Sequence, residues 1–242
     1  MITTDTIALT HDGSRAFDAY LARPAAGAAP SIIIFTEMFG VARHNREMAD
    51  GYARRGFNAL VPNLYWRSAY PGELAFEGPD RDAAWARLAA FDVEAAGRDI
   101  ATAVAWLRSR PYANGKVLAL GFCAGGRMAF VAAARAGVDA AVSFYGMGIA
   151  QHDAEFAQVA CPVQLHYGLK DPHIPQPEID AVMQASGSRP NIETFLYPEA
   201  GHSFFNPIRP AYHAASAKLA GERLEALIGS AFPAAAPAAT AC

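Results

Sequence analysis

The sequence has little cysteine and no long apolar run. Its three cysteines, Cys123, Cys161 and Cys242, form no C-x-x-C pair, and an odd number argues against a complete disulfide framework. This usage fits a reducing, intracellular setting. The first five residues lack the basic and apolar regions of a secretory signal. No apolar run approaches the roughly 20 residues that a membrane helix needs, so we expect a soluble, cytoplasmic protein without a membrane partner.

The sequence also lacks a charge excess of either sign. It has 20 Lys and Arg residues against 23 Asp and Glu residues, a formal net charge of −3, and no basic block. We therefore expect no nucleic-acid partner. The spacings H-x-x-x-H, C-x-x-C and H-E-x-x-H are absent, which argues against a metal site. We expect neither a metal nor a cofactor.

Short β-like runs alternate with helix-like stretches along most of the chain, which has 242 residues. The β-like runs cover residues 7–9, 16–22, 32–35, 58–61, 117–122, 140–144, 163–167 and 192–197, and the helix-like stretches cover 43–55, 93–108, 126–136, 176–185 and 211–228. Such alternation predicts an α/β fold, with a mostly parallel sheet and helices on both faces. Length and pattern favour a single domain over residues 1–230.

Two segments break this pattern. Residues 64–90 carry Tyr, Trp and Phe among Pro, Gly and charges, and we interpret them as a lid or a pocket wall. Residues 231–242 are largely Ala and Pro without periodicity, which predicts a disordered tail.

Cys123 stands at the centre of the run Gly-Phe-Cys-Ala-Gly-Gly, between a β-like and a helical stretch. This is the pattern of a nucleophile elbow with sulfur in place of oxygen, in which Gly121 and Gly125 leave room for a sharp strand-to-helix turn. The first turn of the following helix favours a thiolate and offers N–H groups to an oxyanion. The alternative is a buried cysteine that packs as a small apolar residue.

A cysteine nucleophile needs a base and a carboxylate that orients the base. Asp171 and His202 each follow a β-like run, so both are expected at the sheet edge formed by the carboxyl ends of the strands. The order nucleophile, acid, histidine is that of α/β-hydrolases. Asp171 before a proline could instead be a turn residue, and His202 a surface histidine. His166 and His173 are less well placed to reach the elbow, and His11, His44, His152 and His213 have no evident catalytic context.

The loop after the strongest β-like run carries Glu37 and Met38. In this fold that loop donates one backbone N–H to the oxyanion hole, and the residue after the nucleophile donates another. We predict Met38 and Ala124 as the two donors. A carboxylate at Glu37 would oppose an oxyanion unless it is protonated, paired or turned away, and a salt-bridged loop residue is the competing interpretation.

These motifs together resemble the dienelactone hydrolase family of the α/β-hydrolase superfamily, from about residue 7 to residue 228. The resemblance rests on the motifs at residues 37–40, 121–126, 168–171 and 199–204, supported by residues 62–65, 91–92, 114–117 and 145–146. It implies a Cys123, His202 and Asp171 triad that opens a carboxylate-bearing enol-lactone to maleylacetate in the catabolism of chlorinated aromatics. It also implies that Glu37 pairs with the resting thiol until substrate arrives.

The resemblance further implies a set of substrate-binding residues: Arg81, Trp85, Tyr145, Ser203, Asn206 and Arg209. Arg81 matches a family arginine that binds the substrate carboxylate, and the alternative for it is a surface arginine at a helix start. Asn206 stands where the family has a second such arginine, so either Arg209 replaces it or the carboxylate is held less tightly. Trp85 replaces a family tyrosine, which reshapes the pocket.

The resulting prediction is a carboxylic ester hydrolase that works through an acyl-cysteine. Peptidase activity is less expected, because an amide nitrogen must be protonated before it leaves. The two alternatives are a broader carboxylesterase of the same fold and a catalytically silent ligand-binding domain. We expect a small lactone or ester as the binding partner, and a monomer or weak homo-oligomer.

Overall fold

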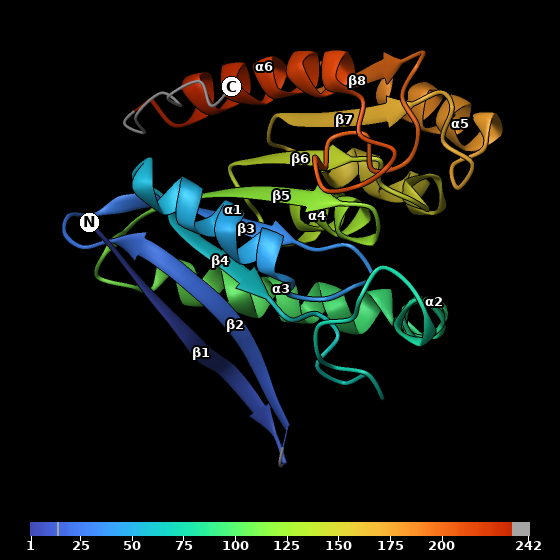
Figure 1. Ribbon diagram of the computed structural model, residues 1–242. Coiled ribbons are helices and arrows are strands. Elements are labelled where there is room, and N and C mark those ends of the chain that lie inside the picture. The colour runs from blue at the N-terminus through green and yellow to red at the C-terminus, as the bar shows by residue number, and fades with distance from the viewer. Residues whose placement is uncertain (14, 234–242) are drawn as a thin grey trace.

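The computed structural model describes residues 1–13 and 15–233. Within them, eight strands form one sheet in the order β1-β2-β4-β3-β5-β6-β7-β8 (Figure 1). The strands are β1 (Ile2–Asp12), β2 (Arg15–Pro24), β3 (Ala29–Phe35), β4 (Asn58–Pro62), β5 (Ala113–Phe122), β6 (Ala140–Phe144), β7 (Val163–Gly168) and β8 (Ile192–Tyr197). β1 pairs antiparallel with β2, and β2 with β4, whereas every pairing from β4 to β8 is parallel. The predicted mostly parallel sheet is therefore confirmed.

The central strands are buried along their whole length. Every residue of β3, β4, β6 and β7 is buried, as are Val117–Phe122 of β5. These strands are largely apolar because helices cover both of their faces. The edge strand β1 is mostly exposed.

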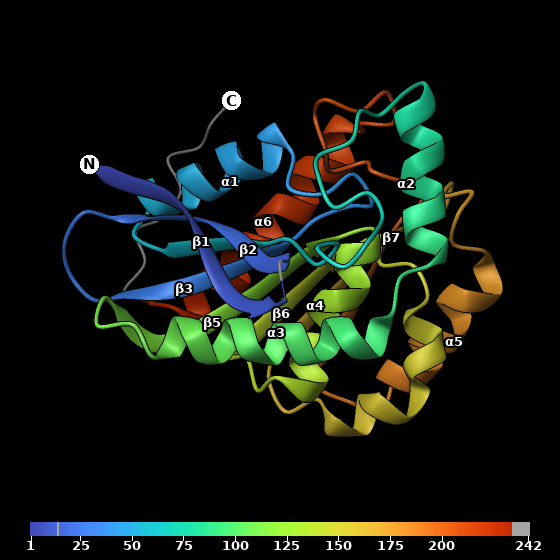
Figure 2. The same ribbon diagram turned by 90° about the horizontal axis from the view of Figure 1, so that it is seen from below.

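The helices form a layer on each side of the sheet. They are α1 (Arg43–Arg54), α2 (Pro79–Ala89), α3 (Val93–Arg108), α4 (Ala124–Arg135), α5 (Gln176–Ser186), α6 (Ala214–Ala231) and a 3₁₀ segment, η1 (Ile149–Gln158). α1 and α6 lie on one face, and α3 and α4 lie on the other (Figures 1 and 2). The sequence reading missed α2 and η1, which have few apolar residues at helical spacing.

The starts of α3 and α6 follow local capping chemistry. Asp92 accepts a hydrogen bond from the Ala95 N–H at the start of α3, and His213 accepts one from the Ser216 N–H at the start of α6. A side-chain acceptor at this position pairs one of the free N–H groups of the first turn. α6 therefore begins at residue 214, three residues after the predicted start.

At its carboxyl end, α6 continues to Ala231 and Phe232 is buried against Phe57, with ring centroids 6.0 Å apart. The folded part thus extends past the predicted boundary at residue 230, and residues 234–242 of the predicted tail lie outside the described residues. In the described residues, no helix combines the length and apolarity needed to cross a bilayer.

Residues 64–90 form a loop followed by α2, which lies beside the carboxyl edge of the sheet (Figure 2). The loop is anchored by Trp66 and Arg67, whose side chains both hydrogen bond to Asp99 of α3. Its role as a lid or pocket wall stays a prediction.

Candidate active site

Loops at the carboxyl edge of the sheet bring the predicted site residues together. Cys123 follows β5, Tyr145 follows β6, Asp171 follows β7, and His202 and Ser203 follow β8. The carboxyl ends of neighbouring parallel strands meet at one edge, where open α/β sheets bind their ligands. Tyr145 and His202 are in contact there, with ring centroids 5.0 Å apart.

The turn at Cys123 has the strained geometry of a nucleophile elbow. Cys123 has φ 58° and ψ −120° and directly precedes α4. A Cβ at Gly121 would lie 1.9 Å from the Gly125 carbonyl oxygen, and a Cβ at Gly125 would lie 2.2 Å from the Phe35 carbonyl oxygen. Only glycine fits at these two positions, which confirms the space argument made from the sequence.

Backbone strain concentrates at this edge. Three non-glycine residues in the described ranges have positive φ: Cys123 at 58°, Tyr145 at 42° and Ser203 at 64°. All three belong to the predicted site. Such conformations persist only where the surroundings enforce them, and they cluster at functional sites.

Asp171 holds His202 in place. The Asp171 Oδ2 lies 2.7 Å from His202 Nδ1, and the Asp171 side chain has no exposed surface. Asp171 Oδ1 accepts from the His173 N–H at 2.8 Å. Burial disfavours the charged imidazole, but the nearby Cys123 sulfur as thiolate and the bond to Asp171 outweigh it and raise the pKa of His202 to about 10. The arrangement favours the imidazolium form of His202 beside Cys123.

The Cys123 sulfur is buried and lies beside a second, polarisable sulfur atom. Its side chain is 5% exposed, and Sγ lies 3.6 Å from the thioether sulfur of Met147. Met147 was not among the predicted residues, since a single methionine after a strand carries no sequence signal.

The two predicted oxyanion donors lie on adjacent backbone segments. Gly125, next to Ala124, packs directly on the carbonyl oxygens of Phe35 and Thr36, just before Met38. Among the described residues, neither the Met38 N–H nor the Ala124 N–H has a hydrogen-bond partner. Free N–H groups at a helix start are suited to binding an anion.

Arg87 of α2 was not among the predicted site residues, yet its side chain is hydrogen bonded to the loop that carries Met38. Its side chain is 2% exposed and donates to the Met38 carbonyl oxygen from Nε at 3.0 Å, and also from a terminal nitrogen. The same guanidinium donates to the carbonyl oxygens of Tyr70 and Gly72 at 2.6 and 2.8 Å. Burial lowers the pKa of Arg87. One arginine in a polar segment gives no sequence signal for such a role.

Glu37 is paired away from the thiol. Its Oε2 lies 3.1 Å from His44 Nε2, and its Oε1 accepts from Asn206 Nδ2 at 3.2 Å. Burial opposes ionisation, but these two partners and then the positive charge of Arg209 lower the pKa of Glu37 below its ordinary value. The contact with Cys123 implied by the family resemblance is absent from its hydrogen bonds in the described residues. His44, for which the sequence indicated no catalytic context, therefore contacts the site.

Two further predicted residues approach from α2. Trp85 lies with its ring centroid 5.5 Å from that of His173, and His173 is 4.9 Å from His202 and nearly perpendicular to it. Arg81 is exposed one helical turn before Trp85. His173, judged less well placed from the sequence, thus contacts His202 directly.

Neither Arg209 nor Asn206 takes the place of the second carboxylate-binding arginine of the family, because both side chains are already engaged. The Arg209 guanidinium lies over the rings of Phe76 and Phe39, at 4.3 and 5.3 Å. Asn206 is buried and bonded to Glu37. A cation over aromatic faces is held by their electrostatic attraction.

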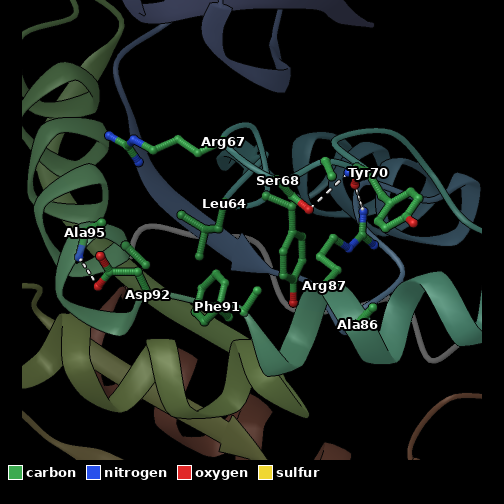
Figure 3. A pocket seen from close by; sticks show the side chains of 13 residues that line it. Leu64, Arg67, Ser68, Tyr70, Ala86, Arg87, Phe91, Asp92 and Ala95 are labelled. Atoms are coloured by element: carbon green, nitrogen blue, oxygen red, sulfur yellow. Dashed lines mark hydrogen bonds between the residues drawn. The ribbon is translucent and has the colours of Figure 1, made fainter.

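Two cavities border this region. One of about 260 Å³ lies between the 64–70 loop and α2–α3, and Arg87 with Tyr70 form part of its wall (Figure 3). Another of about 240 Å³ is lined by Glu37, His44 and Asn206 among apolar side chains. In the described part of the chain, no group of three or more His, Cys, Asp or Glu residues is arranged to hold a metal ion.

Comparisons with known proteins agree with the fold. The model of the dienelactone hydrolase family matches residues 17–232. Carboxymethylenebutenolidase of Pseudomonas putida is 37% identical over 226 residues, covering 92% of this chain and 94% of the relative. Carboxymethylenebutenolidase 1 of Cupriavidus pinatubonensis is 32% identical over 221 residues, covering 91% and 94%.

Among solved structures, one assigned as a dienelactone hydrolase from Klebsiella pneumoniae superimposes with a TM-score of 0.83 at 28% identity, covering 95% of this chain and 99% of that chain. Its fold agrees with the mostly parallel sheet and two helical layers described above. The chain therefore belongs to the dienelactone hydrolase family and is a hydrolase that acts on a lactone or an ester.

Proposed function

We propose that the chain opens the ring of a carboxylate-bearing enol-lactone, converting dienelactone to maleylacetate through an acyl-cysteine. The observation that carries this proposal is the Asp171 to His202 hydrogen bond of 2.7 Å beside the strained Cys123. The names of the relatives, carboxymethylenebutenolidases, support the substrate class. The reaction as proposed uses no cofactor and no metal.

In the first half-reaction the Cys123 thiolate attacks the lactone carbonyl carbon. The carbonyl electrons move to oxygen, and the N–H groups of Met38 and Ala124 stabilise the resulting oxyanion. When the carbonyl reforms, the ring C–O bond breaks and its electron pair leaves as an enolate. A resonance-stabilised enolate leaves without prior protonation. Once released, it takes the proton of the His202 imidazolium, which leaves the imidazole neutral for the second half-reaction.

In the second half-reaction water hydrolyses the thioester. The neutral His202 imidazole, oriented by Asp171, takes a proton from water as its oxygen attacks the acyl carbon. The C–S bond then breaks, and its electrons return to the Cys123 sulfur. The enzyme is left with the thiolate and imidazolium pair in which it started.

Most of the other predicted site residues contribute to substrate binding in this proposal. Arg81 binds the substrate carboxylate, because a planar guanidinium pairs with it through two hydrogen bonds. Trp85, Tyr145 and Ser203 shape the pocket; the Tyr145 hydroxyl is buried with no partner among the described residues and can donate to a bound substrate. Arg209 stays on its aromatic rings.

A broader carboxylesterase is the second candidate, and the environment of Glu37 favours it. Asn206 holds Glu37 rather than a substrate carboxylate, and the thiol is not paired with Glu37. A site of this kind needs no anionic substrate to free its nucleophile. A substrate panel of dienelactones beside neutral aryl esters decides between the two functions by their kcat/KM values.

The nucleophile is tested by Cys123→Ala, with Cys161→Ala as the matched control because Cys161 lies outside the site. We expect Cys123→Ala to abolish turnover with an unchanged fold, and Cys161→Ala to retain it. Mass spectrometry after rapid quenching is expected to find the acyl group on Cys123 in the parent enzyme. Full lactone or ester hydrolysis by Cys123→Ala would refute the proposed mechanism.

A further inference from the structure

His173 occupies a position that the proposed reaction does not yet use. Its ring lies between Trp85 of α2 and His202, at 5.5 and 4.9 Å between centroids. Its backbone N–H is fixed by Asp171 Oδ1. Within the described ranges, neither of its ring nitrogens has a hydrogen-bond partner, although the residue is exposed at the rim. The His173 ring thus packs against two aromatic rings, while its nitrogens form no hydrogen bond with the described residues.

Arg81 faces the same rim. Arg81 and Trp85 are four residues apart on α2, so they lie on one face of the helix. Because Trp85 contacts His173, this face of α2 is turned toward the loop after β7. Arg81 is exposed and its guanidinium forms no ion pair with any described residue, and its charge acts on His173.

Two other polar side chains near the site, Asn206 and Arg209, are engaged elsewhere. Asn206 donates to Glu37, and Arg209 lies on Phe39 and Phe76. A bound carboxylate has four lone-pair positions, and Arg81 satisfies two of them through a bidentate contact. A second donor across the rim from α2 would complete its hydrogen bonding.

We propose that His173 is a specificity-determining residue that binds the substrate carboxylate together with Arg81. The imidazole N–H comes from the loop after β7 and the guanidinium from α2, so the anion bridges the two segments above His202. Trp85, between them, packs against the apolar part of the substrate. This inference rests on the proposed function in taking Cys123 as the nucleophile and Arg81 as a residue that binds the substrate carboxylate.

The charge state of His173 makes this contact dependent on pH. Burial and three neighbouring groups set it: burial and the positive charges of His202 and Arg81 lower the pKa of His173, and Asp171 opposes them. The free enzyme therefore holds a neutral His173 at pH 7, with one N–H donor. A bound carboxylate favours the imidazolium, so anion binding takes up a proton and strengthens as the pH falls.

The test compares two aryl esters that differ in charge, mono-p-nitrophenyl succinate and p-nitrophenyl butyrate. His173→Phe keeps an aromatic ring against Trp85 and His202 but removes the N–H. We expect it to lower kcat/KM for the anionic ester by roughly 10- to 100-fold, the range for one hydrogen bond to a charged group, and to leave the neutral ester nearly unchanged. In an Arg81→Ala background the same substitution should cost less, because both residues bind one carboxylate.

The pH profile gives a readout that a structural role would not move. In the parent enzyme, the ratio of kcat/KM for the anionic over the neutral ester should rise from pH 8 to pH 5.5, where the succinate carboxylate, with an ordinary pKa of about 4.3, stays ionised. In His173→Phe this ratio should be flat. His173→Gln, which retains an N–H but cannot titrate, should keep part of the selectivity with a flat ratio.

An equal loss on both esters would overturn the inference, since His173 would then act through His202 rather than on the carboxylate. An unchanged ratio in His173→Phe would overturn it as well. Failure of the proposed lactone activity is a separate result: the parent enzyme would cleave the two esters but not dienelactones, and the comparison of charges could still be made.

Discussion

At the scale of single residues, the site depends on side chains held in costly conformations. Cys123, Tyr145 and Ser203 have positive φ, and Asp171 is a carboxylate without exposed surface. Each costs free energy in isolation. They persist because close-packed glycines, helix α4 and the hydrogen bonds of Asp171 enforce them, which presents the sulfur and the imidazole to each other at the sheet edge.

The Asp171 to His202 bond yields a prediction on proton affinity and rate. Asp171→Asn keeps the shape but removes the charge and favours the wrong tautomer, so kcat/KM should fall by on the order of 10² to 10⁴. The pKa of His202, about 10 in the parent protein, should fall with it. NMR titration of the His202 ring protons measures this shift directly, and an unchanged titration would contradict the assigned role of Asp171.

The raised pKa of His202 also makes the stability of the fold depend on pH. The folded-state pKa of His202 is raised above the unfolded value of 6.5, so its stabilisation is complete below about pH 6.5 and is lost as the pH rises through 10. In Asp171→Asn that loss should occur at lower pH. Thermal unfolding measured between pH 6 and 10 would reveal it.

At the scale of elements, α2 contacts both the loop after β3 and the rim of the site. Its residue Arg87 reaches into the interior and holds the carbonyl oxygen of Met38, while Trp85 and Arg81 on the same helix face the rim. The helix thus links the loop after β3, which carries the proposed oxyanion donor Met38, to the proposed substrate-binding rim. Gly40, with φ 82°, allows the close approach, since a Cβ there would lie 2.9 Å from the Gly72 carbonyl oxygen.

Arg87 is therefore expected to act as a positioning residue for the oxyanion donor. Arg87→Lys cannot reach three carbonyl groups at once, so Met38 should lose its fixed position and kcat should fall about 10- to 100-fold with little change in KM. Arg98→Lys, an exposed arginine of α3, is the matched control. A KM effect without a kcat effect would assign Arg87 to substrate binding instead.

At the scale of the whole molecule, the parallel sheet places distant segments at one edge and buries the strands beneath it. One buried polar cluster lies inside this core: His166 of β7 is fully buried, with Nδ1 2.7 Å from the Tyr197 hydroxyl and Nε2 3.3 Å from Gln164. Burial, and then the charge of Arg223, lower the pKa of His166 to about 3. The folded protein keeps this imidazole neutral.

Acid sensitivity of the fold should follow from His166. Its folded pKa lies below the unfolded value of 6.5, so its stabilisation is present above pH 6.5 and is lost as the pH falls toward 3, because the unfolded chain binds the extra proton. In His166→Gln the fall in unfolding free energy per pH unit between pH 6 and 4 should be smaller by up to about 1.4 kcal/mol. Urea unfolding at a series of pH values measures the slope, and equal slopes would refute the role of His166.

Much of the fold and part of the site could be read from the sequence, because local chemistry carries the signal. The β-like runs predicted all eight strands. Gly121 and Gly125, on either side of Cys123, indicated a sharp turn at which only glycine fits in these two positions. Helix α2 and η1 were missed because their helical spacing of apolar residues is weak. A lone arginine or histidine likewise carries no periodicity that would mark Arg87, His44 or His173.

By itself, the sequence determined the order of the eight strands and of the helices other than α2 and η1, the elbow at Cys123 and the placement of Asp171 and His202 after strands. These depend on patterns over a few residues. Only the tertiary structure decided the partners: Glu37 with His44 and Asn206, Met38 with Arg87, and His173 between Trp85 and His202. These pairs join residues on separate elements. Their contacts arise from how the loops after the strands and helix α2 pack together at the edge of the sheet.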